Sequence, residues 1–591
     1  MAKVLYVCKR NGALLEAERT RLEHVARALV PDSIRDSQHL ECTFHDGGDI
    51  CYAVSNDKGT FLRDKDSLLC GYLQDPTERW HETGHAGAVG DYAIFRADSG
   101  EVEVLTNRVG SRTVWYFMDD DYFLASTSQR AIIVFLERFE FNERVIPWML
   151  STGSLGPALS WDKRVKRLPA DSVLKLARKQ WVLSLQTTAA VFDAGGEERD
   201  HKAELSAQLD KSVNAIVRNL SKGWKLPLSG GYDSRGILCF MSRGSSIPEG
   251  FGTLTWSLKQ NLEVRGGDAY VAARVARAMN VPHEYLDADV SVEPMQTILD
   301  RFLLNGEGRV DHVSGYMDGM AMWKHLHDAG VKGLIRGDEG FGWLPVNSET
   351  SVRTSVACGL CSDFGNLKHL QQEFGIPTQE LPAHLERRAA ETLESWRDRL
   401  YHEYRIPTIL AGLSDLKLSY VELVCPLLSD DVIACIRRMP DRLRTGKALF
   451  IAIVDEVGPD VEYADSSAVE RLSSAVSNQD LVRVVRDKLG TVESDVFSAD
   501  FLAHVLRDME ARGSRRGGMA RKLLGFARKV IPAGLRLGVR KVAARNIDPF
   551  VVAFRVYIII RMHEILSGDA SACPDDSQRF RRRDRLATDS A

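Results

Sequence analysis

The sequence lacks any long run of apolar residues. In its 591 residues, no uninterrupted apolar stretch reaches the roughly 18 residues that a membrane-spanning helix needs. The strongest candidate, 551–560, is short and carries Arg555, so we expect a buried helix or strand there. The first residues, MAKVLYVCKRNG, contain no apolar segment typical of a signal peptide. These absences predict a protein with no membrane span that works in the cytoplasm.

The sequence also lacks a strong excess of either charge. The formal net charge is -4, which gives no reason to expect nucleic acid as a partner. Apolar residues make up 44% and charged residues 27%, values that are typical of ordinary globular proteins. Because the chain is too long for one compact core, we expect two domains.

Paired cysteines are almost absent. Ten cysteines are scattered along the chain, and Cys358 and Cys361 form the one close pair. A zinc site would need a second pair, or histidines at suitable spacing, and neither is evident. We therefore expect no metal at this pair and reduced thiols, as suits the cytoplasm.

The hydrophobic pattern changes near residue 200. Before it, short apolar runs alternate with Gly, Asp and Asn turns and predict strands at 3–8, 91–95, 102–105, 113–117 and 122–125. The charged stretch 194–202 is typical of a linker, and 204–220 has the apolar spacing of a helix. Strands predicted at 224–228, 252–256 and 331–335 then alternate with helices, which indicates a parallel sheet covered by helices. We predict an α/β protein with domains at 1–195 and 196–591.

The most informative stretch is 225–235, which reads KLPLSGGYDSR. An apolar strand enters a double-glycine turn, and a helix follows. Glycines allow close backbone approach to a ligand, and the amides at a helix N-terminus attract anions. An aspartate beside phosphate requires a bridging cation, a role that Mg²⁺ fills well. The predicted phosphate-binding residues are Leu228, Ser229, Gly230, Gly231, Asp233 and Ser234.

This turn lacks the GK[ST] sequence of a Walker loop. It resembles the SGGxDS loop of the ATP pyrophosphatases, which implies that ATP is cleaved between its α and β phosphates and that a substrate is adenylated. The alternative reading is an ordinary strand-turn-helix. The stretch from Asp268 to Tyr285 resembles the adenine-holding strand and helix of asparagine synthetases.

Three downstream blocks strengthen the resemblance to asparagine synthetases. The segment 335–343 resembles their second glycine motif, which implies that Asp338 and Glu339, with Asp233, face Mg²⁺ and pyrophosphate. The segment 442–450 resembles the block whose lysine, here Lys447, reaches the α-phosphate. The segment 420–430 matches more loosely, because Val424 stands where the family has arginine.

The first part of the chain resembles the Ntn-type glutaminase domain of class II amidotransferases, through 90–95, 107–116 and 123–127. That domain uses a cysteine exposed as the new N-terminus, and its own α-amine is the base. Here position 2 is alanine, and Cys8 lies inside a predicted strand. We therefore expect an Ntn-like α+β sandwich without glutaminase activity, which serves as a structural relic or a docking surface.

Without ammonia made in place, another amine must attack the activated carboxylate. Relatives with this arrangement include β-lactam synthetases and the macrolactam cyclases of lasso peptides, and we favour the latter. Holding both ends of one molecule makes ring closure nearly unimolecular. Glu422 is our candidate general base, with Tyr404 or Tyr420 nearby. The implied partners are a small-molecule or peptide carboxylate, a precursor peptide and a leader-processing protein; the implied cofactors are ATP and Mg²⁺.

Three alternatives stay open. An asparagine synthetase or other amidotransferase would use free ammonia. A non-catalytic scaffold would have lost turnover, although Asp233, Asp338 and Lys447 are all present. Sulfur transfer to tRNA shares the loop but needs a catalytic cysteine, for which Cys239 and Cys425 are the candidates. The basic segment 512–545 has three readings: a surface that holds a peptide or an acidic precursor, a solvated pair of amphipathic helices, or an element that lies on a membrane surface.

Overall fold

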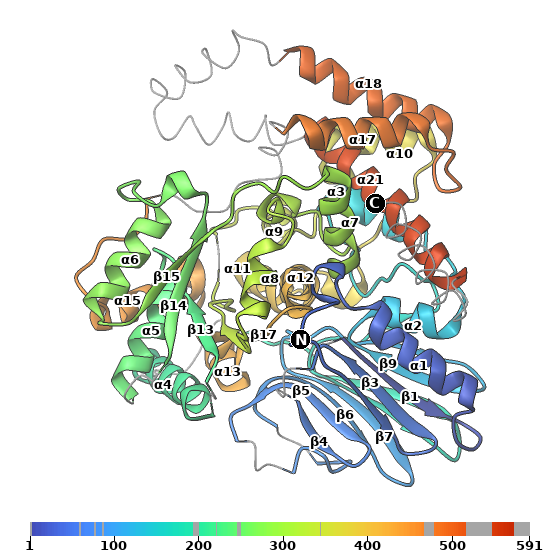
Figure 1. Ribbon diagram of the computed structural model, residues 1–591. Coiled ribbons are helices and arrows are strands. Elements are labelled where there is room, and N and C mark those ends of the chain that lie inside the picture. Colours follow the sequence, from blue (N-terminus) through green and yellow to red (C-terminus); the bar gives the residue numbers. More distant parts are fainter. Residues whose placement is uncertain are drawn as a thin grey trace, which may run out of the picture.

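The computed structural model contains two antiparallel sheets, one parallel sheet and a surrounding set of helices (Figure 1). It describes residues 3–57, 61–75, 79–85, 88–192, 200–219, 222–244, 250–342, 344–465, 478–515 and 546–571. The fold is therefore mixed α/β, as predicted. The predicted linker at 194–202, the basic segment 512–545 and Trp343 lie largely or wholly outside the described residues.

The first two sheets come from the first third of the chain and face each other. One has the strand order β10-β8-β9-β1-β3-β2 and the other the order β12-β11-β7-β6-β5-β4. The ring of Tyr6 in β1 stacks on Phe95 in β6 at 5.7 Å between centroids, so the two inner faces share a core. The five strands expected here, now β1, β6, β7, β8 and β9, are all present within two residues of their predicted bounds. The strands are β1 (Val4–Lys9), β2 (Cys42–Asp46), β3 (Ile50–Ser55), β4 (Leu62–Asp64), β5 (Ser67–Leu73), β6 (Gly90–Ala97), β7 (Glu101–Thr106), β8 (Trp115–Met118), β9 (Tyr122–Ser126), β10 (Lys166–Arg167), β11 (Ser172–Ala177) and β12 (Val182–Thr187).

Helices cover the outer face of the first sheet. Helix α1 (Glu16–Ala28) packs on β3, and α2 (Gln129–Leu136) packs on β9 (Figure 1). This cover explains why β1 is buried on both faces and reads as a continuous apolar run, whereas β11 alternates buried and half-buried positions. The sequence pattern predicted strands here but neither helix.

The parallel sheet has the order β15-β14-β13-β16-β17, and all its neighbouring strands run in the same direction. Its strands are β13 (Trp224–Pro227), β14 (Gly252–Ser257), β15 (His283–Asp287), β16 (Gly333–Ile335) and β17 (Glu422–Val424). Helices α4 (His201–Asn219), α5 (Tyr232–Gly244) and α6 (Asp268–Ala278) connect and cover them. The predicted alternation of strand and helix is confirmed. The central strand β13 leads directly into the glycine turn.

The remaining helices form the rest of the second part of the chain. They are α3 (Val145–Thr152), α7 (Met295–Gly306), α8 (Ala321–Asp328), α9 (Glu349–Ser355), α10 (Gly365–Phe374), α11 (Leu393–Leu400), α12 (Ala411–Leu418), α13 (Asp430–Arg437), α14 (Asp441–Arg444), α15 (Ala448–Val457), α17 (Gln479–Thr491), α18 (Ala499–Arg515) and α21 (Pro549–Ser571). A π-helical turn, Tyr401–Leu410, joins α11 to α12.

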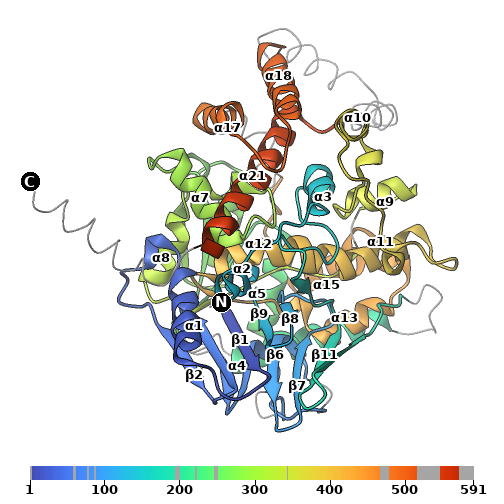
Figure 2. The same cartoon turned by 90° about the vertical axis from the view of Figure 1, so that its right-hand side faces the viewer.

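Helix α21 contains the apolar run at 551–560, and it is a buried helix as expected. It lies against α2, α3, α17 and α18 (Figure 2). Its Arg555 forms an ion pair with Asp311 at 2.7 Å between Nε and Oδ2 and donates to the carbonyl of Leu150. Among the described residues, no helix has the length and apolar character that crossing a membrane requires.

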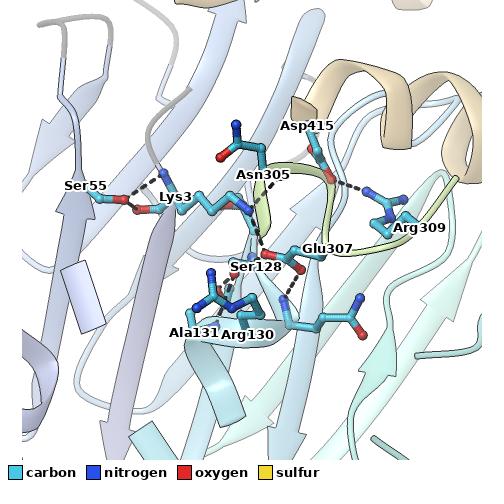
Figure 3. A network of polar contacts seen from close by, with 12 residues as sticks. Lys3, Ser55, Ser128, Arg130, Ala131, Asn305, Glu307, Arg309 and Asp415 are labelled. Carbon is cyan, nitrogen blue, oxygen red and sulfur yellow. Dashed lines mark hydrogen bonds and ion pairs between the residues drawn. The ribbon is translucent and has the colours of Figure 1, made fainter. Parts of the chain in front are cut away.

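A buried polar network joins the antiparallel sheets to the helices of the second part (Figure 3). The ammonium of Lys3 donates to Glu307 Oε1 at 2.8 Å and to the carbonyl of Asn305 at 3.0 Å. Glu307 also accepts from the hydroxyl of Ser128 and from the amide of Gln129. Glu307 is 2% exposed, so a single carboxylate holds three elements of the chain together.

The strands between residues 4 and 187 form the antiparallel sheets, and those between residues 224 and 424 form the parallel sheet. This division agrees with a boundary near residue 195. The Lys3–Glu307 network and the contacts of α21 nevertheless cross that boundary. The domain limits 1–195 and 196–591 stay a prediction.

Replacing Glu307 with alanine should destabilise the whole protein. It would leave the Lys3 ammonium buried without its carboxylate, a change that typically costs about 3–5 kcal/mol. Urea unfolding of Glu307→Ala measures this loss. The matched control is Glu23→Ala, whose partner Arg27 is 3.7 Å away and exposed, and we expect a change within about 0.5 kcal/mol. Equal effects of the two substitutions would show that the network does not join the two parts.

Candidate functional site

The glycine turn is a closed loop held by its own side chains. The amide of Ser229 donates to Ser234 Oγ at 2.9 Å, and the amide of Gly231 donates to Ser229 Oγ at 3.3 Å. The amide of Gly230 donates to Asp268 Oδ1 at 2.9 Å, at the start of α6. On the other side, Leu228 is fixed to β14 through the carbonyl of Leu254. The predicted residues thus form one compact turn between β13 and α5.

Close packing leaves little or no space for a side chain at two glycines. A Cβ on Gly230 would lie 2.6 Å from Ala464 Cβ, and a Cβ on Gly337 would lie 3.1 Å from Asp233 Cβ. A real Cβ does not approach other carbons that closely without displacement. Gly337 therefore allows the segment after β16 to lie directly on the start of α5, which brings the second predicted motif to the first.

Three charged side chains meet at this point. Lys447 Nζ lies 2.9 Å from both carboxylate oxygens of Asp233 and 3.0 Å from Glu339 Oε1. Lys447 has a left-handed backbone conformation and immediately precedes α15. Asp233 belongs to α5, and Glu339 lies in the loop after β16. We call Asp233, Glu339 and Lys447 the lysine cluster. Residues more than 200 positions apart are thus brought into contact, and the structure places these three predicted site residues together.

Burial and charge shift the titration of the cluster. Burial raises the pKa of Glu339 to about 7, because the pull of Lys447 is offset by the repulsion of Asp233. Burial likewise raises the pKa of Asp233, against the effect of Lys447. Burial lowers the pKa of Lys447, but the two carboxylates outweigh it and the net shift is upward. One positive and two negative groups therefore share the site, in which Glu339 is buried and Asp233 is partly exposed.

Asp338 lies beside this cluster in a separate ionic environment. Burial would raise its pKa, but the nearby guanidinium of Arg336, 3.6 Å away, holds the pKa below its usual value. The same carboxylate is 3.8 Å from the Cys425 sulfur. Burial lowers the pKa of the neighbouring Lys417 to about 7. Asp338 stays ionised and adds its field to that of Asp233.

No group of three His, Cys, Asp or Glu side chains suited to a metal ion exists within the described part of the chain. Of the three predicted metal ligands, Asp233 and Glu339 contact Lys447, and Asp338 contacts Arg336. These acids approach one another but do not form a protein-only cage. Their assignment as magnesium ligands stays a prediction.

Glu422 lies in an environment that does not suit a general base. It is 1% exposed, and its Oε1 is 2.7 Å from Arg112 Nη1. Burial would raise its pKa, but Arg112 holds the pKa below the usual value. A carboxylate that already neutralises an arginine is a poor proton acceptor. The geometry favours a structural ion pair between β17 and the antiparallel sheets over the predicted catalytic role.

The two tyrosines expected near Glu422 are also buried. Tyr404 shares a hydrogen bond with Ser154, and Tyr420 shares one with Ser33. Burial raises the pKa of Tyr420 to about 12 and raises that of Tyr404 further. Neither hydroxyl joins Glu422 in a described hydrogen bond. The assignment of Glu422 as the base stays a prediction, and these contacts do not support it.

A second segment covers the glycine turn, and the sequence did not predict this cover. The guanidinium of Arg235 donates to the carbonyls of Val461 and Glu462 at 2.7 and 2.8 Å and stacks on the Tyr463 ring at 3.8 Å. The amide of Ala464 then donates to the carbonyl of Gly230 at 3.1 Å. Arg235 is the last residue of the SGGYDSR sequence. Its position next to the glycine turn is the one sequence feature that could have suggested that it holds the segment 461–464 against this turn.

The cysteines fit structural roles. Burial raises the pKa of Cys239 to about 11 and raises that of Cys425 well above its usual value, so neither carries the thiolate that sulfur transfer needs. Cys358 and Cys361 are buried and form no disulfide bond with each other.

Comparisons with known proteins give little guidance. No family model matches this chain, and no curated protein matches it. A search of solved structures finds a glutamine phosphoribosylpyrophosphate amidotransferase from B. subtilis, complexed with ADP and GMP, at 8% identity and a TM-score of 0.21. That match covers 48% of this chain and 91% of the other. A second structure, described as the allosteric regulatory enzyme of purine biosynthesis, has 11% identity and a TM-score of 0.20 over 52% and 78% of the two chains. Scores this low carry no argument, so the resemblance to asparagine synthetases rests on the motifs and the geometry of the site.

The raised pKa of Glu339 predicts a pH-dependent stability difference. The folded pKa of about 7 exceeds the usual 4.5, so the stability that protonated Glu339 provides is lost as pH rises through that interval. Without nucleotide or metal, Glu339→Gln should nearly match the wild type at pH 4 and exceed it by about 1–3 kcal/mol at pH 8. Urea unfolding at both pH values measures the difference. Glu23→Gln is the exposed control, and an equal or less stable Glu339→Gln at pH 8 would contradict the account.

Proposed function

We propose that the protein is an ATP-dependent, AMP-forming ligase that adenylates a carboxylate and joins it to an amine. The observation that carries this proposal is the lysine cluster at the start of α5. It combines a strand–glycine turn–helix, a lysine and two acids at hydrogen-bonding distance. Helix N-termini and lysines bind phosphate, and acids beside phosphate hold magnesium.

The residues present fit a magnesium triphosphate. Magnesium is usually bound by one or two carboxylates together with phosphate oxygens, which suits a site with acids but no protein-only cage. Asp233 and Glu339 would hold the ion, with Asp338 beside them. When bound, magnesium neutralises charge on the phosphate oxygens. The guanidinium of Arg336 offers a further donor, because its Nε is buried without a hydrogen-bond partner among the described residues.

The reaction needs charge stabilisation more than covalent participation by the protein. A substrate carboxylate oxygen attacks the α-phosphorus of ATP, the bond to the bridging oxygen breaks, and pyrophosphate leaves. Lys447 stabilises the negative charge that grows on the phosphates, an effect that is strong in a water-poor site. The amine then attacks the acyl carbon, AMP leaves, and an amide and one proton are produced.

Intramolecular macrolactam formation on a peptide is the form of this reaction that we favour. An amine in the same molecule as the carboxylate gains the advantage of proximity. With Glu422 paired to Arg112, no base is assigned to the amine.

The test is release of AMP and pyrophosphate from Mg-ATP with purified protein. Candidate peptides, aspartate with ammonia, and glutamine are supplied in turn, and mass spectrometry follows the products. We expect AMP and pyrophosphate with a peptide only, together with loss of one water from that peptide. Lys447→Met should lower kcat by at least 10²-fold, because it removes a charge that acts on the leaving pyrophosphate.

The control is Lys202→Met, an exposed lysine paired with Glu456 at 2.7 Å, which should keep full activity. Turnover with aspartate and ammonia would replace the peptide proposal by an ammonia-using synthetase. Release of ADP and phosphate would contradict adenylation. Tight nucleotide binding without turnover of any substrate would favour the scaffold alternative.

A further inference from the structure

A second group of charged side chains lies directly beside the lysine cluster. Arg336 and Asp338 flank Gly337 in the loop after β16, and Lys417 comes from the last turn of α12. A Cβ on Gly337 would lie 3.1 Å from Asp233 Cβ, so the chain between Arg336 and Asp338 touches the start of α5. Residues that follow β16 lie at the carboxyl edge of the parallel sheet, where ligands of such sheets bind. We call Arg336, Asp338 and Lys417 the arginine group.

Lys417 is a buried cation without an acid of its own. It is 6% exposed, and its ammonium forms no ion pair or hydrogen bond within the described part of the chain. The ring of Trp323 lies 5.9 Å from its Nζ. Removing an ammonium from water is costly unless an anion is close, and burial together with the charge of Arg336 lowers the pKa of Lys417 to about 7. A bound anion would offset this cost.

Arg336 also has donors that the protein does not use. Its Nη2 lies 3.6 Å from Asp338 Oδ1, which is longer than a normal hydrogen bond. Its Nε is buried without a hydrogen-bond partner among the described residues. Because a guanidinium carries five N–H donors in a fixed plane, Arg336 can bind a phosphate oxygen and a second anion at the same time.

The charge balance of the arginine group is the reverse of that in the lysine cluster. Burial would raise the pKa of Asp338, but Arg336 and Lys417 hold it below its usual value, so both cations lie within range of this one carboxylate. In the lysine cluster, one cation contacts two acids. Adenylation brings a magnesium triphosphate and a carboxylate together, and the two neighbouring groups complement these two ligands.

We propose that Arg336 and Lys417 bind the carboxylate that is adenylated and hold it beside the triphosphate. A guanidinium binds a carboxylate through two parallel hydrogen bonds, and the lysine adds a compact positive charge. Fixing the carboxylate next to the α-phosphate makes its attack nearly unimolecular. This inference rests on the proposed ligase reaction, and it adds the residues that recognise the nucleophile of that reaction.

Carboxylate binding is tested with full-length protein in the absence of ATP, by reductive alkylation of lysines. The probe is glyoxylate with cyanoborohydride, the comparison is uncharged glycolaldehyde, and peptide mass spectrometry measures the label at each lysine. Relative to the exposed Lys202, Lys417 should react about tenfold faster with glyoxylate than with glycolaldehyde, because Arg336 attracts the carboxylate. Arg336→Gln should remove this preference and Arg336→Lys should keep part of it. The matched control Arg353→Gln removes an arginine of similar exposure that pairs with Asp363 at 2.6 Å, and it should keep the preference.

Three outcomes would overturn the inference. They are equal relative rates with the two aldehydes, an unchanged preference in Arg336→Gln, and no label at Lys417 with either aldehyde. The comparison in the wild type needs no variant, and circular dichroism with thermal unfolding checks the fold of Arg336→Gln. If the preference is found but no substrate releases AMP, the carboxylate site stands and the ligase proposal fails. AMP release without the preference would leave the ligase and remove this site.

Discussion

The contact of Lys447 with Asp233 and Glu339 is the interaction on which the account of this protein depends. It joins α15, α5 and the loop after β16, and it requires Gly337 to let that loop lie against α5. Lys447 lies between two acids, which leaves one negative charge in excess when both are ionised; burial, together with the nearby Asp233 carboxylate, raises the pKa of Glu339. The same imbalance makes the site suited to a cation with bound phosphate.

Much of this arrangement was predictable from local sequence. The apolar runs before residue 195 and the alternation after it identified five strands of the antiparallel sheets and the parallel sheet itself. The double glycine at 230–231 predicted the turn, because strand, glycine and helix follow one another without interruption. The resemblance then predicted Lys447, which lies 214 residues after Asp233 and which no local pattern could connect to it.

The contacts that were not predicted have a physical cause in common. Glu422 and Arg112 are 310 residues apart, so no local sequence pattern predicts their ion pair. The match at 420–430 therefore suggested a carboxylate without a partner at Glu422. The Arg235–Tyr463 contact and the Lys3–Glu307 network depend on tertiary packing in the same way. Strands β2–β5 and β10–β12 and helices α1–α3 were not predicted; β3, α2 and α3 contain short apolar runs that do not distinguish a strand from a buried helix. These contacts form between residues that are far apart in the sequence, and a short stretch of one sequence does not show which distant residue will be the partner.

A crystal structure with Mg²⁺ and α,β-methylene-ATP, which resists cleavage between the α and β phosphates, tests the central claim most directly. The account predicts that the triphosphate lies on the turn at 229–234, that Mg²⁺ contacts Asp233 or Glu339, and that Lys447 turns from these acids to a phosphate oxygen. A nucleotide bound elsewhere, or a bound nucleotide with Lys447 still joined to both carboxylates and no metal beside them, would contradict it.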